Sequence, residues 1–227
     1  MNRAKRILYT LSMAAIPAFS SAQTVQLPTM GVFDTSMMRE YIENLRYINN
    51  HLNSIRPAIQ LCREKVTPHF KNGNWNVCRS IFRDFFNCVT VYDSEIPAIL
   101  DLVYMNGVCK IETGEDASGL RNLKIAKNHG SSEANRFLEQ YFEKKVASAE
   151  SHFQNREYDT ALSEIEWAFN SNYHSGYAYY LQGEILEALS LFKEAKKAYK
   201  KAKKLQSPYA EKALKELKNK LKRKEGI

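Results

Sequence analysis

Two segments near the C-terminus of this 227-residue chain repeat with a period of 34 residues. Small and aromatic residues recur in both in the same order: Ala149, Tyr158, Ala161, Ile165 and Ala168, then Gly183, Phe192, Ala195, Tyr199 and Ala202. This period predicts a helical hairpin in each repeat, because small residues let two helices approach closely while aromatic rings fill the gap between repeats. We therefore expect an all-α solenoid of stacked hairpins, a scaffold that usually binds a partner.

The second segment resembles a tetratricopeptide repeat. In that family the first helix has a small residue followed one turn later by a large one, and the second helix has its own alternation of residue sizes. The residues at these positions here are Gly183, Leu186, Phe192, Ala195, Tyr199, Ala202 and Leu205. Pro208 comes one residue after the family's closing proline, and Tyr179 stands where the family often has tryptophan. The resemblance implies a right-handed solenoid whose clearest repeats span about 142–175 and 176–209.

Two weaker copies with similar internal spacing lie upstream. One of them contains Gly107, Ile111, Gly114, Leu123 and Ala126, followed by an Asn-His-Gly run that resembles the Sel1-like variant of the family. The other contains Val66, Phe70, Gly73, Trp75, Cys78, Phe82 and Phe85. These copies imply units at about 59–99 and 100–141, within a solenoid that covers 35–227. For the unit around Trp75 alone, an ordinary helical hairpin is the alternative.

The first 22 residues have the features of a signal peptide. A basic start at residues 3–6 precedes an apolar run at 7–19, and small residues at 20–22 suit signal peptidase. The run is shorter than the roughly 20 residues that span a bilayer, although an uncleaved, anchoring N-terminus is the alternative. Cleavage would leave an extended segment at 23–34 and no transmembrane helix. The start resembles exported proteins of the Bacteroides group, which implies the periplasm or cell envelope of a bacterium.

Apolar positions recur at intervals of three and four along most of the chain, which contains only 9 Gly and 6 Pro. The pattern predicts a first helix that is capped by Asp34, Thr35 or Ser36 and extends past Leu52. Pro57 should separate this helix from the next, in which Pro68 introduces a bend. Further helices are expected at 75–91, 94–112, 117–128, 132–154, 157–171, 175–189, 191–205 and 208–224.

The formal charge is +8, and basic residues concentrate at the C-terminal end. The helix expected at 208–224 has one apolar stripe and a lysine-rich remainder, as the solvated capping element of a solenoid requires. The excess of lysine is larger than solubility requires, so an alternative interpretation is that this helix contacts an anionic envelope surface. The candidate residues for that contact are Lys215, Lys218, Lys222 and Arg223.

The sequence lacks the motifs that several functional classes require. Nucleic-acid binding through Lys197, Lys200, Lys201 and Lys204 is disfavoured because Arg is scarce in that segment and no nucleic-acid motif is present. The five His residues are widely separated, and no zinc motif, nucleophile elbow or phosphate-binding loop occurs. The sequence therefore predicts a protein without enzymatic activity, cofactor or metal.

Four cysteines follow the predicted leader, with spacings that contain no Cys-x-x-Cys motif. Cys62 and Cys78 fall on adjacent expected helices and form the first candidate disulfide, with Cys88 and Cys109 as the complementary pair. Cys78 also stands where the repeat requires a small buried residue, so a packed free thiol is the alternative.

The resemblance also implies where a partner would bind, since the first helices of tetratricopeptide repeats line their concave face. The outward positions correspond to Val146, Glu150, Phe153 and Gln154 in one repeat, and to Tyr177, Tyr180, Glu184 and Glu187 in the next. This mixture of aromatic and acidic groups suits an extended peptide with an apolar anchor and a basic residue. Packing of the tyrosines between repeats is the alternative. We expect a non-catalytic module that binds a protein or peptide. The alternative is a structural protein that adheres to anionic surfaces of the envelope through its basic C-terminal helix.

Overall fold

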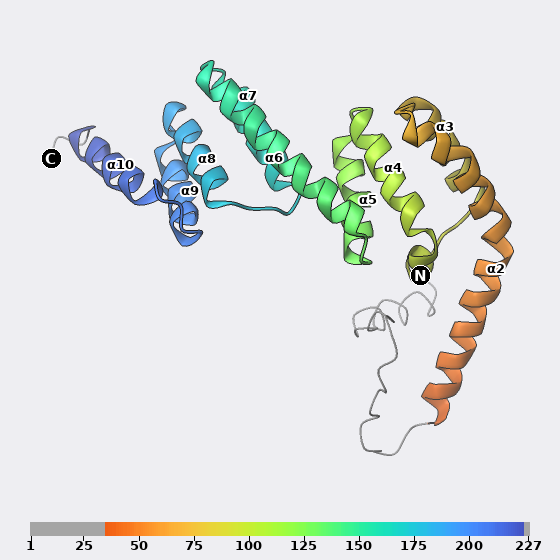
Figure 1. The fold of residues 1–227 in the computed structure, drawn as a ribbon. Coiled ribbons are helices and arrows are strands. Elements are labelled where there is room, and N and C mark those ends of the chain that lie inside the picture. The colour runs from red at the N-terminus through yellow and green to blue at the C-terminus, as the bar shows by residue number, and fades with distance from the viewer. Residues whose placement is uncertain (1–34, 225–227) are drawn as a thin grey trace. The chain divides into compact units, whose positions relative to one another are not determined.

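A computed structural model describes residues 35–224 of the chain, so the predicted signal peptide and the segment 23–34 lie outside the described residues. Every regular element in this range is helical (Figure 1), which confirms the predicted all-α class. The chain divides into two compact units, residues 1–114 and residues 115–227. Each unit is described below by itself.

The first unit begins with one long helix where the sequence predicted two. Helix α2 extends from Thr35 to Lys71 (Figure 1). It contains both Pro57 and Pro68, so the predicted break at Pro57 is wrong. Proline removes one backbone hydrogen bond from a helix and usually bends or ends it. Beyond Pro57, however, α2 packs on the next helix and buries Ile59 and Val66. This tertiary burial offsets the local cost of the proline.

The rest of the first unit consists of α3, Trp75–Cys88, the 3-10 helix η1, Asp93–Ile99, and α4, Leu100–Glu112. The sequence predicted a single helix at 94–112, but its first two turns are η1. In η1, the carboxylate of Glu95 contacts two different partners. It accepts a hydrogen bond from the Tyr92 amide at 3.0 Å and meets His51 Nδ1 of α2 at 2.6 Å, although Glu95 is only 1% exposed. These contacts fix η1 against α2.

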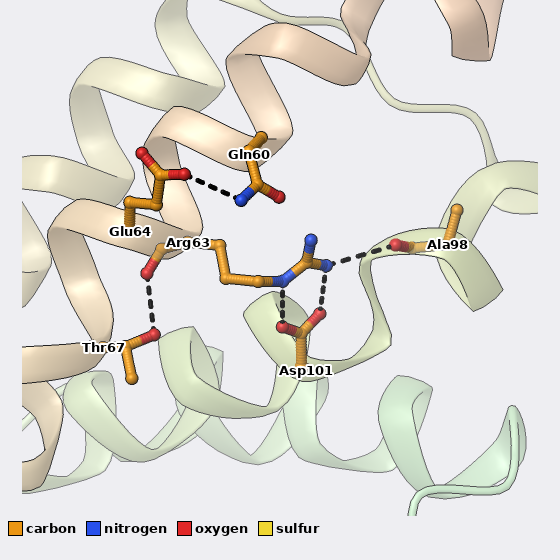
Figure 2. A network of polar contacts seen from close by, with 6 residues as sticks. All are labelled: Gln60, Arg63, Glu64, Thr67, Ala98 and Asp101. Carbon is orange, nitrogen blue, oxygen red and sulfur yellow. Dashed lines mark hydrogen bonds and ion pairs between the residues drawn. The ribbon is translucent and has the colours of Figure 1, made fainter.

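Figure 2 shows a second connection between α2 and the start of α4. The Arg63 guanidinium donates from Nε and Nη2 to the two carboxylate oxygens of Asp101, at 2.6 and 2.9 Å. Burial alone would raise the pKa of Asp101, but the guanidinium outweighs that effect and holds the pKa below its usual value. The paired, planar geometry sets the angle at which the helices meet.

Neither predicted disulfide is present among the four cysteines, which are all free thiols. In this structure Cys62 and Cys88 are not bonded to Cys78 and Cys109, the partners that the sequence spacing suggested. Instead, the thiols of Cys78 on α3 and Cys109 on α4 are close enough for each to shift the pKa of the other. Sequence spacing cannot reveal this neighbour, because it depends on how α3 packs on α4.

The second unit contains six helices: α5 Asp116–Asn128, α6 Ser132–Gln154, α7 Tyr158–Phe169, α8 Gly176–Ala188, α9 Phe192–Lys204 and α10 Ala210–Lys224. Their boundaries lie within two residues of those predicted. Helices α6 and α7 pack together as one hairpin, and α8 and α9 pack together as the next. Helix α5 packs on α6, and α10 packs on α9.

The backbone of this unit repeats with the period seen in the sequence. Arg156 and Ser190, in the turns that follow α6 and α8, have φ values of 63° and 62°. Asn172 and Gln206, which follow α7 and α9, have φ values of 65° and 58°. Left-handed conformations are uncommon for residues other than glycine. Their recurrence at matching positions shows that the two hairpins end their helices in the same way.

The small residues of the repeat form the core between these helices. Ala149, Ala161, Ala168, Ala195 and Ala202 are each 0% exposed. The prediction that Ala195 is buried is therefore confirmed. Alanine lets the helices approach closely, and larger buried side chains such as Ile165 and Tyr199, 34 residues apart, fill the matching space in each hairpin.

Candidate functional site

A pocket of about 450 Å³ opens in the second unit between the end of α6, helix α8 and helix α10. It contains four of the residues that the sequence placed on a binding surface: Phe153, Tyr180, Glu184 and Glu187. Its other lining residues are Ala188, Tyr199, Pro208, Tyr209, Lys212, Ala213, Glu216 and Lys220. We call this set the tyrosine-glutamate pocket.

Aromatic rings form one wall of the pocket. The ring of Tyr180 lies 5.3 Å from that of Tyr209 and 5.9 Å from that of Tyr199, measured between centroids. Tyr177, one turn earlier on α8, lies 6.4 Å from Tyr180. Such a cluster gives a rigid apolar surface, because each ring is held by its neighbours. Tyr177 and Tyr209 remain 39% and 55% exposed, so this surface is open to a ligand.

The two pocket carboxylates on α8 are in different states. Glu187 accepts hydrogen bonds from the Tyr199 hydroxyl at 3.1 Å and from Lys220 Nζ at 2.5 Å. Glu184 accepts a hydrogen bond from the Tyr180 hydroxyl at 2.6 Å. Within residues 35–224, no basic side chain forms an ion pair with Glu184. Of the two pocket carboxylates on α8, one thus has its charge balanced by a lysine and the other does not.

The pKa of Glu184 is raised from its ordinary value. Burial is the largest cause, the negative charges of Glu187 and Glu150 add to it, and the hydrogen bond from Tyr180 opposes it. A cation placed beside Glu184 would remove this penalty, since an opposite charge favours the ionised carboxyl. The electrostatics of the pocket therefore favour a positively charged group.

The tyrosine hydroxyls remain protonated and act as donors. Burial and a hydrogen bond to the Glu150 carboxylate raise the pKa of Tyr177 to about 12. Burial and the bond to Glu184 likewise raise the pKa of Tyr180. The Tyr180 hydroxyl thus orients the Glu184 carboxylate in the pocket.

The remaining predicted surface residues have three different placements. Val146 is 9% exposed and packs in the core with Ala149 and Ile165, which leaves little of its side chain open to a ligand. Its side chain fills the space between α6 and α7. Glu150 is half-buried and lies beside the pocket, where it binds the Tyr177 hydroxyl. Gln154 is exposed and does not line the pocket.

Sequence reasoning missed the part of the pocket that comes from α10 and the turn before it. Tyr209, Glu216 and Lys220 were not singled out, because this segment was interpreted as a charged cap or as a contact with an anionic surface. The alternation of apolar residues in this segment predicted its buried face. The sequence pattern did not indicate that side chains of α10 would contact the carboxylates of α8.

The cations predicted to meet an anionic surface, Lys215, Lys218, Lys222 and Arg223, are all exposed on α10. Helix α9 carries a second set, spaced by four, three and four residues: Lys193, Lys197, Lys200 and Lys204. This α9 lysine stripe lies opposite the buried Ala195, Ala198, Tyr199 and Ala202, since such intervals return to one face of a helix. Within the described helices, none of the four stripe lysines is in an ion pair.

Residues 35–224 contain no group of three or more His, Cys, Asp or Glu side chains arranged to hold a metal ion. None of the helices in the described range is both long enough and apolar enough to span a membrane.

Comparison with known proteins places few limits on this chain. No protein-family model matches it, and no curated protein matches it. A solved structure titled "MamA D159K mutant 2" is similar over 74% of this chain and 86% of that chain, with 16% identity and a TM-score of 0.33. A likeness at this TM-score does not establish a shared fold or function.

Proposed function

We propose that the protein is a non-catalytic interaction module of the tetratricopeptide-repeat type. The tyrosine-glutamate pocket carries this proposal. It brings together four residues predicted to face a ligand, together with a carboxylate that lacks a basic partner among the described residues. The 34-residue recurrence of buried small residues and left-handed turns supports the repeat assignment.

The chemistry of the pocket favours a peptide segment that carries a basic side chain beside an apolar one. Tyr180 and Tyr209 offer flat rings against which an apolar residue or the stem of an arginine would pack. Glu184 would pair with the basic group, which lowers the cost of keeping that carboxylate ionised. A partner protein that presents such a segment in an extended or helical form fits this pocket.

Lys220 is a basic residue of the pocket that already pairs with one of its carboxylates. Its ammonium group already holds Glu187 at 2.5 Å, and its side chain is 62% exposed. The Glu187 side chain is only 15% exposed, so this ion pair is partly buried and contributes more than a surface pair would. An incoming basic residue can pair with Glu184, which has no basic partner among the described residues, while Lys220 stays in place. Binding therefore does not require the helices to separate.

The site of action in this proposal is the periplasm or envelope of a bacterium. The basic start, short apolar run and small residues at 20–22 support export. The partner would then be another exported or envelope protein.

A selection with random peptides displayed on phage tests the proposal. Peptides enriched on the protein should contain Lys or Arg next to an aromatic or aliphatic residue. Glu184→Gln should lose this enrichment, whereas Glu166→Gln, an exposed change on α7, should keep it. Equal enrichment on the wild-type protein and on Glu184→Gln would remove the pocket as the binding site.

A second candidate function is attachment to an anionic envelope surface. The observation that favours it is the α9 lysine stripe, which adds four exposed cations to those of α10. The two functions differ in their response to salt. Aromatic contact in the pocket should survive moderate salt, whereas attachment through exposed lysines should weaken strongly.

A further inference from the structure

The core of the first unit holds two sulfur atoms from different helices. Cys78 lies in the first turn of α3 and Cys109 in the last turn of α4, and both side chains are 0% exposed. The two helices pack together, and these two turns meet, since Arg79 of α3 donates to Thr113 Oγ1 at 2.9 Å and Thr113 Oγ1 donates to the Cys109 carbonyl at 2.8 Å. The two thiols are close enough for each to shift the pKa of the other. Cys78 Sγ also donates to the Val66 carbonyl at 3.9 Å, which holds its side chain between α2 and α4.

The other two cysteines have different surroundings. Cys88 is exposed at the opposite end of α3, ten residues after Cys78, a separation of about 15 Å along a helix. A disulfide requires Cα atoms within about 7 Å, so Cys88 cannot replace Cys78 beside Cys109. Cys62 is buried next to Arg63 and Asp101. Cys78 and Cys109 are the two thiols that influence each other, whereas the pKa of Cys62 responds to Arg63 and Asp101.

We propose that Cys78 and Cys109 form a disulfide that joins α3 to α4 when the chain folds in a thiol-oxidising compartment. The oxidant is a protein or small-molecule disulfide. The Cys78 thiolate attacks one sulfur of that disulfide and releases its first thiol, which leaves a mixed disulfide. The Cys109 thiolate then attacks the Cys78 sulfur and releases the second thiol. Two electrons pass to the oxidant, and the two protons leave with its thiols.

The timing of this reaction follows from burial. The thiolate is the reacting form, and burial raises the pKa of both Cys78 and Cys109. Once the reduced unit has folded, neither sulfur meets an oxidant in solution. The bond therefore forms during folding, when the thiols are accessible and native packing brings them together.

This inference is independent of the tyrosine-glutamate pocket, which lies in the second unit. It changes the assignment that spacing suggested, since both cysteines of the new pair had been matched with other partners. A covalent link between α3 and α4 would restrict their separation in the unfolded chain and so stabilise the first unit.

Oxidative refolding of the full chain tests the proposal. The reduced, unfolded protein is refolded with a mixture of oxidised and reduced glutathione, alkylated, and mapped by mass spectrometry. We expect the loss of two hydrogen atoms and a cross-linked peptide pair containing Cys78 and Cys109. Folded, reduced protein exposed to the same mixture should form the bond at least about tenfold more slowly.

Two variants separate this pairing from its alternatives. Cys62→Ser with Cys88→Ser should form the same cross-link in the same yield, because the pair is intact. Cys109→Ala should leave Cys78 alkylated after refolding, with helicity by circular dichroism confirming that the chain has folded. A dominant cross-link from Cys62 to Cys78 or from Cys88 to Cys109, or four free thiols after oxidative refolding, would overturn the proposal.

Discussion

The ring of Tyr199 on α9 lies against the backbone of Gly183 on α8. A Cβ atom added to Gly183 would fall 2.4 Å from both Cδ1 and Cε1 of that ring, closer than such atoms can approach. The hydroxyl of the same tyrosine donates to Glu187 in the pocket. The absence of a side chain at Gly183 therefore allows one ring to fill the hairpin and also to orient a pocket carboxylate.

Gly183→Ala should destabilise the second unit by about 1–3 kcal/mol, because the ring must move and the hairpin is overpacked. The higher helix propensity of alanine offsets part of this loss. Urea denaturation gives the free energy of unfolding. In a double-mutant cycle, Gly183→Ala should cost much less when Tyr199→Leu is already present. Strictly additive effects would show that the two residues are not in contact.

Ala195→Arg should destabilise the protein more severely, by at least about 3 kcal/mol, since a charged side chain would enter a site that is 0% exposed. Thermal melting followed by circular dichroism measures the effect. Lys196→Arg, at the next position and exposed, is the matched control and should melt like the wild-type protein. A wild-type melting curve for Ala195→Arg would contradict the packing of α8 on α9.

Glu184→Gln should separate stability from binding. The pKa of Glu184 is higher in the folded state, so the stability it contributes is present below the ordinary carboxyl range and is lost as the pH rises through the folded pKa. The glutamine variant should therefore gain up to about 1 kcal/mol relative to the wild-type protein at neutral pH, and this gain should vanish in acid. Urea titrations at both pH values measure it.

The same Glu184→Gln variant should bind the selected basic peptides about tenfold more weakly, because a charge-assisted contact is lost. Fluorescence anisotropy of a labelled peptide provides the affinity. Glu166→Gln serves as the control for both measurements. Loss of stability without loss of affinity would assign Glu184 to the fold rather than to the site.

Removal of the α9 lysine stripe by four Lys→Gln changes tests the second candidate function. If the stripe contacts an anionic leaflet, binding to phosphatidylglycerol vesicles in low salt should fall by at least about a hundredfold. Vesicle sedimentation measures the bound fraction. A control with the same loss of charge changes four exposed residues elsewhere to Gln: Lys71, Arg121, Arg136 and Lys144. Equal losses in both proteins would indicate a response to net charge alone.

The predicted leader gives a direct test of export. The mature protein recovered from the producing bacterium should begin at Gln23, because residues 20–22 supply a signal-peptidase site. Intact mass spectrometry identifies the N-terminus. Recovery of a chain that retains Met1 would favour the uncleaved, anchoring alternative.

The helices of the second unit could be predicted closely from their own residues. A hairpin of this kind needs small residues where its helices meet, and Ala149, Ala161, Ala195 and Ala202 mark those positions in the sequence at a constant interval. Four of the twelve residues that line the pocket could also be predicted, because Phe153, Tyr180, Glu184 and Glu187 occupy outward positions of the same pattern. Val146 has an outward position in the family's pattern but a core position here.

The sequence by itself determined the helical class, the period and the buried face of each helix, because these follow from interactions between residues a few positions apart. Tertiary structure alone decided that α2 continues through Pro57, that Cys78 meets Cys109, and that Lys220 reaches Glu187. Each of these depends on contacts between different helices. Local propensity cannot report such contacts, since their free energy arises only after the helices have packed.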